Sequence, residues 1–394
     1  MSGPLNGIRV IDASAVVSGP FAAQMLAEQG ADVIKIEAPP IGDISRIGAQ
    51  RKRGISALYA NCNRGKRSIV LDLTKDEGRE ILFELVKGTD VFIQNYRPGA
   101  VERMGIAAAD LHAIEPSLLY VSISGYGPTG PYANRRVYDP IIQAITGHTA
   151  IQKNPDIPIP DLIRNIVVDK ATALTVAQAV SAALFARERG AGGQHIVVPM
   201  IDVSTAFFFP DGMLRHTLLD EDAGDGPALY DVYRLWETSD GHLVWFAASD
   251  SENHGLFRAL GHPEWVEDER FATVNARIAN AALLGELLNA EFRKWETQEL
   301  YQRMVDEDVP VGPLNSIEDM LDDPQIKHNG MIEERVHDAA GRLRSTRGAV
   351  RFSATPQETT RLAPELGENT DDVLGELGYG AEKIAALRRD DVVA

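Results

Sequence analysis

Residues 165–204 constrain the fold of this chain more than any other stretch, because they contain the pattern of a strand, a helix and a second strand. The apolar, β-branched run 166–168 is typical of a strand buried on both faces. Good helix formers with apolar side chains at helical spacing fill 171–189, and a glycine-rich turn then leads into an apolar run from His195. A βαβ unit of this kind predicts a parallel sheet.

Asp169 stands at the junction between the first predicted strand and the helix. In open parallel sheets, ligands bind at the carboxyl ends of the strands, so this position is typical of a functional residue. Aspartate is also a favoured helix N-cap. From this stretch alone the cap is the better supported of the two interpretations, and both stay open.

The first half of the chain repeats the alternation of strand and helix. Only one glycine lies within 14–20, so the spaced glycines of a dinucleotide-binding fingerprint are missing. We expect an α/β fold with a doubly wound, Rossmann-like parallel sheet in a large domain over 1–204. A capping box at 74–77 predicts the start of a helix that runs to about residue 87. The further predicted strands are 8–12, 33–37, 68–73, 91–93 and 119–123.

The pattern changes in the second half of the chain. The stretch 205–227 ends in acids, glycines and proline, which predicts an exposed linker. A hairpin pattern over 230–247 and the amphipathic helices after it predict a small α+β domain over 228–325. We expect the C-terminal segment 326–394 to return to the large domain. Its strand patterns are at 331–336 and 349–352, and two short helices follow them.

The charge of the chain excludes several classes of partner. Its 39 basic and 57 acidic residues give a formal net charge of −18, which opposes general binding to nucleic acid or to an anionic membrane. The single cysteine, Cys62, allows no internal disulfide. The apolar stretch 174–186 is too short to cross a bilayer, and the N-terminus lacks the pattern of a signal peptide. We therefore expect a cytoplasmic protein.

Basic residues nevertheless gather at several places in this acidic chain. Each group alone is typical of a solvated turn or a surface ion pair, but a position beside the predicted crevice favours Arg97 and Arg136 as ligands of an anion. Tyr96 and Tyr138 are placed to stack on a base, although structural tyrosines are commoner. The histidines lack metal-ligand spacing, so no metal is expected. The basic groups are 51–53, 64–67, Arg97 with Arg103, and 135–136.

Several short sequences along the whole chain point to one family. They are LNGIRVID at 5–12, GADVIKIE at 30–37, NYRPG at 95–99 and PELGENT at 364–370, with a further match at 122–131. Together they make the chain resemble the family III CoA transferases. These include formyl-CoA and carnitine CoA transferases and are related to the α-methylacyl-CoA racemases.

The resemblance implies that Asp169 is a nucleophile that attacks an acyl-CoA thioester, forming a mixed anhydride and then an aspartyl-CoA thioester. A carboxylate suits this role because its anhydride is as activated as the thioester. The resemblance also implies acyl-CoA and a carboxylic acid as substrates, no tightly bound cofactor, and an interlocked homodimer. The family's CoA contacts fall at Val16, Leu71, Asn95, Tyr96, Arg97, Ala100, Arg103, Arg136, Tyr138 and Met200.

Two other activities stay open. The related racemases move an α-proton with a His–Asp pair and carry Gly-His-Asp where this chain has Val-Tyr-Asp at 137–139. Proton transfer at carbon needs two positioned proton carriers, so the transferase is favoured. A non-catalytic acyl-CoA-binding protein would leave Asp169 as a helix cap. Ala38 replaces an arginine common in the family, and no run of four glycines occurs, so we expect substrates other than formyl-CoA and oxalate.

Overall fold

The computed structural model describes residues 2–48, 50–152, 160–220, 222, 224, 226, 228–357 and 361–394. The chain divides into two compact units. The first unit combines Met1–Leu214 with Asn329–Ala394, and the second unit is Arg215–His328. The first unit is therefore built from two stretches of chain that the second unit separates.

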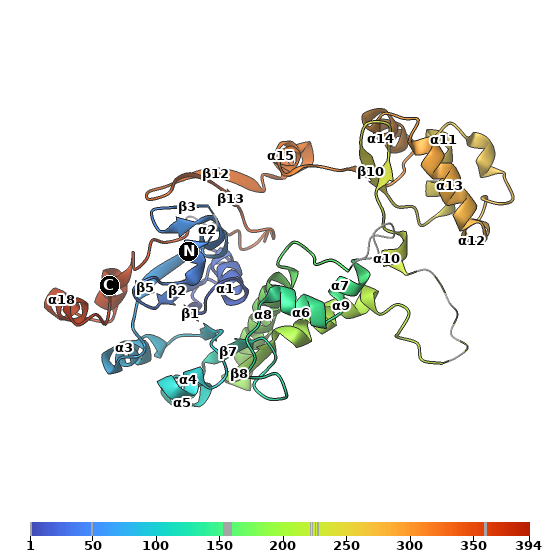
Figure 1. The fold of residues 1–394 in the computed structure, drawn as a ribbon. Helices are drawn as coiled ribbons and strands as arrows, with labels where there is room; N and C mark the ends of the chain where they lie inside the picture. Colours follow the sequence, from blue (N-terminus) through green and yellow to red (C-terminus); the bar gives the residue numbers. More distant parts are fainter. Residues whose placement is uncertain are drawn as a thin grey trace. The chain divides into compact units, whose positions relative to one another are not determined.

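A six-stranded parallel sheet forms the centre of the first unit (Figure 1). The strand order is β5-β2-β1-β6-β7-β8, and each neighbouring pair is parallel. This order corresponds to the 3-2-1-4-5-6 order of the Rossmann fold, which confirms the predicted α/β fold with a parallel sheet. The strands are β1 (Arg9–Ala13), β2 (Asp32–Glu37), β5 (Lys66–Val70), β6 (Val91–Gln94), β7 (Leu119–Ser124) and β8 (Gln194–Pro199).

Helices cover both faces of this sheet. Neighbouring strand residues point to opposite faces, so Val10 packs with α1 and α8 while Ile11 packs with α3 and α5. Both residues are fully buried. The helices of the first part of the chain are α1 (Ser18–Glu28), α2 (Ala57–Cys62), α3 (Asp76–Val86), α4 (Ala100–Met104), α5 (Ala108–Ile114), α6 (Asp139–Ile145), α7 (His148–Ile151), α8 (Val167–Ala186) and α9 (Met200–Gly212).

The strand predicted at 166–168 is wrong, because α8 begins at Val167. The strand before α8 in the sheet is β7, and the crossover from β7 to β8 contains α6, α7 and α8. A short apolar run fits a buried strand and a buried helix start equally well. Val168 is only 1% exposed, so burial of this run was expected correctly although its conformation was not.

Helix α8 is longer than the apolar stretch 174–186 suggested. With the π-helical turn Arg187–Ala191 it runs through 25 residues, which is long and apolar enough to cross a bilayer by length and composition. Half of an 18-residue apolar stretch of this helix is buried, and the helix packs against α1 and α9. The core helix of a globular protein has these properties.

Two local predictions fail, and a third is confirmed only in part. Thr74 does not cap α3, because its hydroxyl donates to Asp72 and the N-cap residue is Lys75. The hairpin predicted over 230–247 is present, since β9 (Trp236–Glu237) pairs antiparallel with β10 (His242–Trp245), but a helical turn, α10 (Leu229–Val232), precedes its short strands. The stretch 349–352 is not a strand, since β12 (Ile332–His337) pairs with β13 (Gly341–Thr346) instead. A second small hairpin joins β3 (Arg51–Lys52) to β4 (Ile55–Ser56).

Part of the predicted linker is helical. Helix α9 extends to Gly212, so 205–212 belong to a helix of the first unit. Residues 221, 223, 225 and 227 of that linker lie outside the described part of the chain.

The second unit combines a three-stranded antiparallel sheet, in the order β11-β10-β9, with helices. Its core contains a cluster of aromatic rings: Trp236 lies 5.0 Å from Phe292 and 5.3 Å from Trp245, measured between ring centroids. The elements are β9 (Trp236–Glu237), β10 (His242–Trp245), α11 (Asp250–Ala259), α12 (Val274–Ala279), α13 (Ala281–Phe292), α14 (Thr297–Asp306), β11 (Val311–Pro313), α15 (Ile317–Asp322) and α16 (Pro324–Asn329).

The C-terminal segment packs against the open edge of β5. Asn369 exchanges two hydrogen bonds with the backbone of Ser68, and Val393 forms an isolated bridge with Leu71. Helices α17 (Thr370–Glu376) and α18 (Ala381–Arg389) add buried side chains to the core on the α3 face. The last residues therefore complete a core that the first residues began.

Leu374→Ala tests this contribution. Leu374 is fully buried on α17, so its truncation is expected to lower the free energy of unfolding by about 2–5 kcal/mol. Denaturant unfolding of the purified protein measures the change. Lys383→Ala on the exposed face of α18 is the control and should leave stability within about 0.5 kcal/mol of wild type. A Leu374→Ala protein as stable as this control would contradict the packing described.

Candidate active site

Asp169 is the third residue of α8, and a second carboxylate caps the helix in its place. Asp139 Oδ2 accepts the N–H of Val168 at 2.8 Å and the N–H of Asp169 at 3.0 Å. The residue at the N-cap position, Ile166, makes no side-chain cap. The interpretation of Asp169 as the helix cap is therefore wrong: the N-terminal N–H groups are satisfied by an aspartate from another helix.

Asp139 is held in place by its own helix. It begins α6 and is 3% exposed, and Gln143 one turn later donates to its Oδ1. The same Gln143 side chain accepts the N–H of Ile163 at 3.0 Å and donates to its carbonyl at 3.2 Å. These bonds join α6 to the chain that leads into α8, so the two aspartates have a fixed relation.

The surroundings of Asp169 disfavour its charged form. Burial and the neighbouring Asp139 carboxylate raise the pKa of Asp169 from 3.8 to about 6, against the opposing effect of a hydrogen bond with Ser18. Above about pH 6 the side chain is nevertheless ionised. The site therefore holds a carboxylate that is charged at neutral pH and weakly stabilised.

Asp169 opens into a cavity of about 260 Å³ at the carboxyl ends of the strands. The loops that follow β1, β6 and β7 supply most of its wall, and α9 contributes its first residue. The helix after β1 packs on one face of the sheet and the helices after β6 on the other, so the cavity lies where the winding of the sheet reverses. Ligands of open α/β sheets bind at this switch point.

Seven of the ten predicted CoA contacts line the cavity together with Asp169. Leu71 is fully buried against the C-terminal segment, and Ala100 and Arg103 lie on α4 just beyond the lining loop. The role of all ten as CoA contacts stays a prediction. The seven that line the cavity are Val16, Asn95, Tyr96, Arg97, Arg136, Tyr138 and Met200.

The amide of Asn95 is engaged by the protein itself. Its Oδ1 accepts the N–H of Ala15 at 2.9 Å, and its Nδ2 donates to the carbonyl of Ala15 at 2.7 Å. Asn95 thereby joins the loop after β6 to the loop after β1. Its side-chain amide therefore fixes the wall of the cavity through bonds within the protein.

Ser18, Arg135 and Asp139 are among the lining residues that were not predicted as site residues. Ser18 stands at the start of a helix that follows a predicted strand, the same placement that drew attention to Asp169. Asp139 begins the next predicted helix after the loop at 125–131. The position of both residues in the strand–helix alternation was a usable signal.

The basic group 64–67 forms internal ion pairs and is not an open anion site. Arg64 and Arg67 are 5% and 7% exposed, and Lys66 is 1% exposed. Among the described residues, no group of three or more His, Cys, Asp or Glu side chains is placed to hold a metal ion. The partners of the basic group are Glu28 for Arg64, Asp12 for Lys66, and Asp32 with Glu376 for Arg67.

Asp169→Asn is expected to stabilise the protein above about pH 6, by up to about 3 kcal/mol. Because folding raises the pKa of this carboxyl, the folded protein binds the proton more tightly than the unfolded chain does. The wild type therefore loses stability as the pH rises from 3.8 to about 6, whereas the asparagine variant does not. The difference should disappear below about pH 4.

Chemical unfolding of both proteins at about pH 4 and pH 8 measures this difference. Asp202 occupies the same third position in α9 but is exposed, so Asp202→Asn is the matched control and should show no gain. Equal stability of wild type and Asp169→Asn at pH 8 would contradict the electrostatics described.

Comparison with known proteins identifies the family. The model of CoA-transferase family III matches residues 5–370. The succinate–glutarate CoA-transferase of Agrobacterium fabrum is 35% identical over 95% of this chain and 96% of that protein. A formyl-CoA:oxalate CoA-transferase of Escherichia coli is 30% identical over 100% of both chains. The crystal structure of a CAIB/BAIF family protein from Brucella suis is 33% identical and covers 96% of this chain and 100% of that chain, with a TM-score of 0.82. The chain therefore belongs to CoA-transferase family III and is a CoA transferase.

Proposed function

We propose that the protein moves CoA from an acyl-CoA donor to a carboxylic acid acceptor through covalent intermediates on Asp169. The observation that carries this proposal is the carboxylate of Asp169 at the wall of the switch-point cavity, with a pKa raised to about 6. A perturbed carboxyl group in such a crevice is typical of a catalytic residue. The family adds support, because its members bind acyl-CoA thioesters and carboxylic acids.

The proposed first half-reaction starts from the ionised carboxylate. An oxygen of Asp169 attacks the thioester carbonyl carbon, the C–S bond breaks, and CoA leaves as the thiolate. The thiolate then attacks the side-chain carbonyl carbon of the mixed anhydride. This step releases the donor acid as its carboxylate and leaves Asp169 as a CoA thioester.

The second half-reaction reverses these steps with the acceptor. Its carboxylate attacks the aspartyl thioester, CoA thiolate leaves, and a new mixed anhydride forms. The thiolate then attacks the acceptor's acyl carbon, which yields the product acyl-CoA and restores the Asp169 carboxylate. No water enters either half, so a closed cavity suits this reaction.

The charges around Asp169 support a nucleophilic role. Asp139 already occupies the N–H groups of Val168 and Asp169, so the start of α8 offers little further stabilisation to the Asp169 carboxylate. Helix α1 begins at Ser18 beside the cavity and has no side-chain cap. We propose that the positive end of α1 stabilises the oxyanion that each attack creates.

The acceptor that we propose first is a dicarboxylic acid. The Agrobacterium fabrum relative is named for succinate and glutarate, and three arginines line the cavity here: Arg97, Arg135 and Arg136. Guanidinium groups bind carboxylates and phosphates in a forked geometry. One or more of these arginines would then hold the far carboxylate, while the others face the CoA phosphates.

We propose that the active form is an interlocked homodimer in the cytoplasm. Helices α8 and α9 carry several large apolar side chains that are exposed in the single chain, which is typical of a surface that a partner covers. These include Leu174, Phe185, Phe207 and Phe209. The single, buried cysteine fits a reducing compartment.

Asp169→Ala is expected to abolish CoA transfer while CoA binding persists, because the variant lacks the nucleophile but keeps the rest of the cavity wall. A screen of acyl-CoA donors against succinate, glutarate and other acids gives the activity, and hydroxylamine trapping with mass spectrometry gives the modified residue. Asp202→Ala, at the same position in α9, should remain active.

Three outcomes would count against this mechanism. Transfer by Asp169→Ala would remove Asp169 from it. Exchange of the α-proton of an acyl-CoA with solvent deuterium, without transfer, would favour the racemase. Binding of acyl-CoA without transfer or proton exchange would favour a non-catalytic acyl-CoA-binding protein.

The pH profile of the wild type provides a second prediction. Since the ionised carboxylate must attack, kcat/KM should fall about tenfold per pH unit below about pH 6. Asp139→Asn removes the neighbouring negative charge but keeps an acceptor for the start of α8, so its profile should shift to lower pH. If the pH profile of kcat/KM is the same in Asp139→Asn and wild type, a group that does not sense Asp139 controls the profile.

A further inference from the structure

Val16 has a backbone conformation that its side chain disfavours. Its φ is 73°, in the left-handed region, where a β-branched residue costs about 1–3 kcal/mol. Val16 also lines the cavity and stands two residues before Ser18, which contacts Asp169. A strained residue persists only where its surroundings determine its conformation. The groups that hold Val16 therefore matter for the site.

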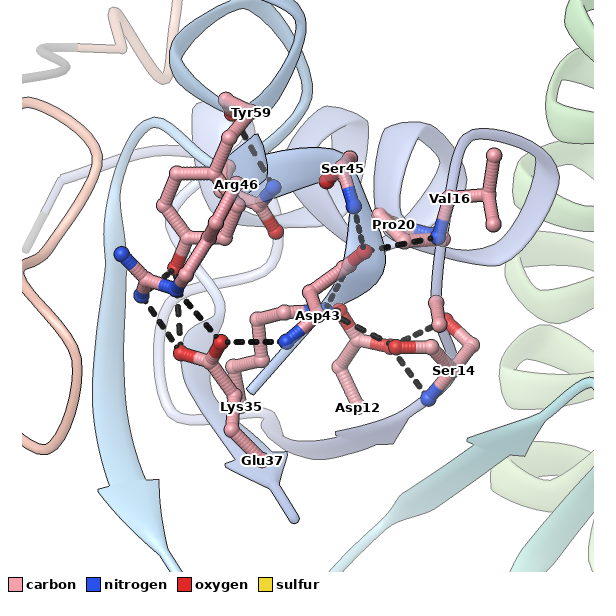
Figure 2. Close-up of polar contacts among 12 residues, drawn as sticks. Asp12, Ser14, Val16, Pro20, Lys35, Glu37, Asp43, Ser45, Arg46 and Tyr59 are labelled. Carbon is pink, nitrogen blue, oxygen red and sulfur yellow. Dashed lines mark hydrogen bonds and ion pairs between the residues drawn. The ribbon is translucent and has the colours of Figure 1, made fainter. Parts of the chain in front are cut away.

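The peptide unit between Ala15 and Val16 is held at both of its polar groups. Asn95 donates to the Ala15 carbonyl at 2.7 Å. The Val16 N–H donates to Asp43 Oδ1 at 3.1 Å (Figure 2). On the other side of Val16 the chain enters α1, whose Ala22 and Leu26 are fully buried. With the peptide plane before Val16 and the helix after it both fixed, φ at Val16 has little freedom.

Asp43 is rigid enough to impose this geometry. Its Oδ1 also accepts the N–H of Ser45 at 2.9 Å, and its own N–H donates to Glu37 Oε2 at 3.0 Å. Asp43 is 3% exposed and lies directly before a short 3₁₀ helix (Ile44–Ile47). The carboxylate cannot follow the Val16 N–H if the peptide turns away.

Lys35 neutralises Asp43 and binds the same loop from the opposite side. Its Nζ lies 3.0 Å from Asp43 Oδ2 and 3.7 Å from Asp12 Oδ2, and it donates to the Ser14 carbonyl at 2.8 Å. Lys35 is fully buried. A buried charge is expensive unless it is paired and hydrogen-bonded, as this one is.

The electrostatics of the pair agree with its geometry. Burial favours the neutral acid, but Lys35 and the N–H groups of Ser45 and Val16 hold the pKa of Asp43 below its ordinary value. Burial likewise disfavours the ammonium of Lys35, but Asp12, Asp43 and Glu37 raise its pKa above the ordinary value. Both groups are therefore charged at neutral pH.

We infer that Asp43, with Lys35 as its counter-ion, is a positioning residue that holds Val16 in the left-handed conformation and so places the loop 15–18 against Asp169. This inference rests on the proposed function, since positioning matters only if the cavity is the active site. Asp43 does not line the cavity and would act on the reaction through Val16 alone.

A double-mutant cycle tests the link between the two residues. Asp43→Ala removes the acceptor, so kcat/KM should fall by about tenfold or more in the wild-type background. Glycine adopts φ 73° without strain, so in a Val16→Gly background the same change should lower kcat/KM less than about threefold. A role in stability alone would give the same loss in both backgrounds, and that result would overturn the inference.

A charge-neutral variant covers the case in which Asp43→Ala does not fold, because this substitution leaves Lys35 without its nearest partner. Lys35→Met with Asp43→Ala replaces the ion pair by apolar side chains, a change that buried pairs often tolerate. Asp12 keeps Lys66 at 2.7 Å. Adding Val16→Gly to this double variant is expected to restore most of the lost kcat/KM. No restoration would count equally against the inference.

The control is Asp32→Asn. Asp32 begins the strand that carries Lys35, but pairs with Arg67 at 2.7 Å at the far end of the sheet. Its effect on kcat/KM should be small and identical in the two backgrounds.

A structural readout separates this inference from the proposed function. If the wild type binds CoA but transfers none, the proposed function fails, and the cycle is then measured on the Kd for CoA. A crystal structure of the Lys35→Met/Asp43→Ala variant should show Val16 outside the left-handed region. Val16 still at positive φ in that structure would overturn the inference whatever the activity.

Discussion

The carboxylate of Asp139 at the start of α8 is the interaction on which the site depends. A helix N-terminus usually stabilises an anion placed near it. Here that stabilisation goes to Asp139, which takes the N–H groups of Val168 and Asp169. Asp169 lies in the same turn but faces burial and a like charge instead. One aspartate builds the helix start, and the other keeps a raised pKa.

The loop after β1 makes a tight turn from strand to helix, for which dinucleotide-binding folds use glycine. In those folds, glycines after the first strand let the chain turn tightly into the helix. In this chain Val16 makes the turn at positive φ, and the buried charges of Lys35 on β2 and of Asp43 in the loop after β2 hold it there. The turn thereby keeps a side chain at the cavity wall. The same sheet order thus carries a first loop of a different construction.

The alternation of apolar runs with amphipathic helices predicted the parallel sheet, although it also predicted a strand at 166–168 that the sheet does not contain. The sequence also identified Asp169 as a candidate site residue. The end of a strand and the start of a helix both place a side chain near the carboxyl edge of the sheet, so the wrong assignment of 166–168 did not affect this prediction. The sequence could not reveal that 167–168 are helical, because the deciding partner, Asp139, lies about 30 residues away in the sequence. The ion-pair partners of the basic group 64–67 could not be predicted for the same reason: Asp12, Glu28 and Asp32, which neutralise it, are distant in sequence. Local pattern identified the elements, and long-range pairing decided their roles.

The route of the chain has a consequence for how the protein is made. The core on the α3 face includes Leu374 and Val393, which are translated after the whole second unit. During synthesis the edge of β5 and the apolar side chains near it therefore remain exposed. They stay exposed while more than two hundred further residues, from Val70 to Asn329, are translated. Domains generally fold in order from the N-terminus as they leave the ribosome. The first unit departs from that order: it starts first and closes last, so the nascent chain needs protection from association until its C-terminal segment arrives.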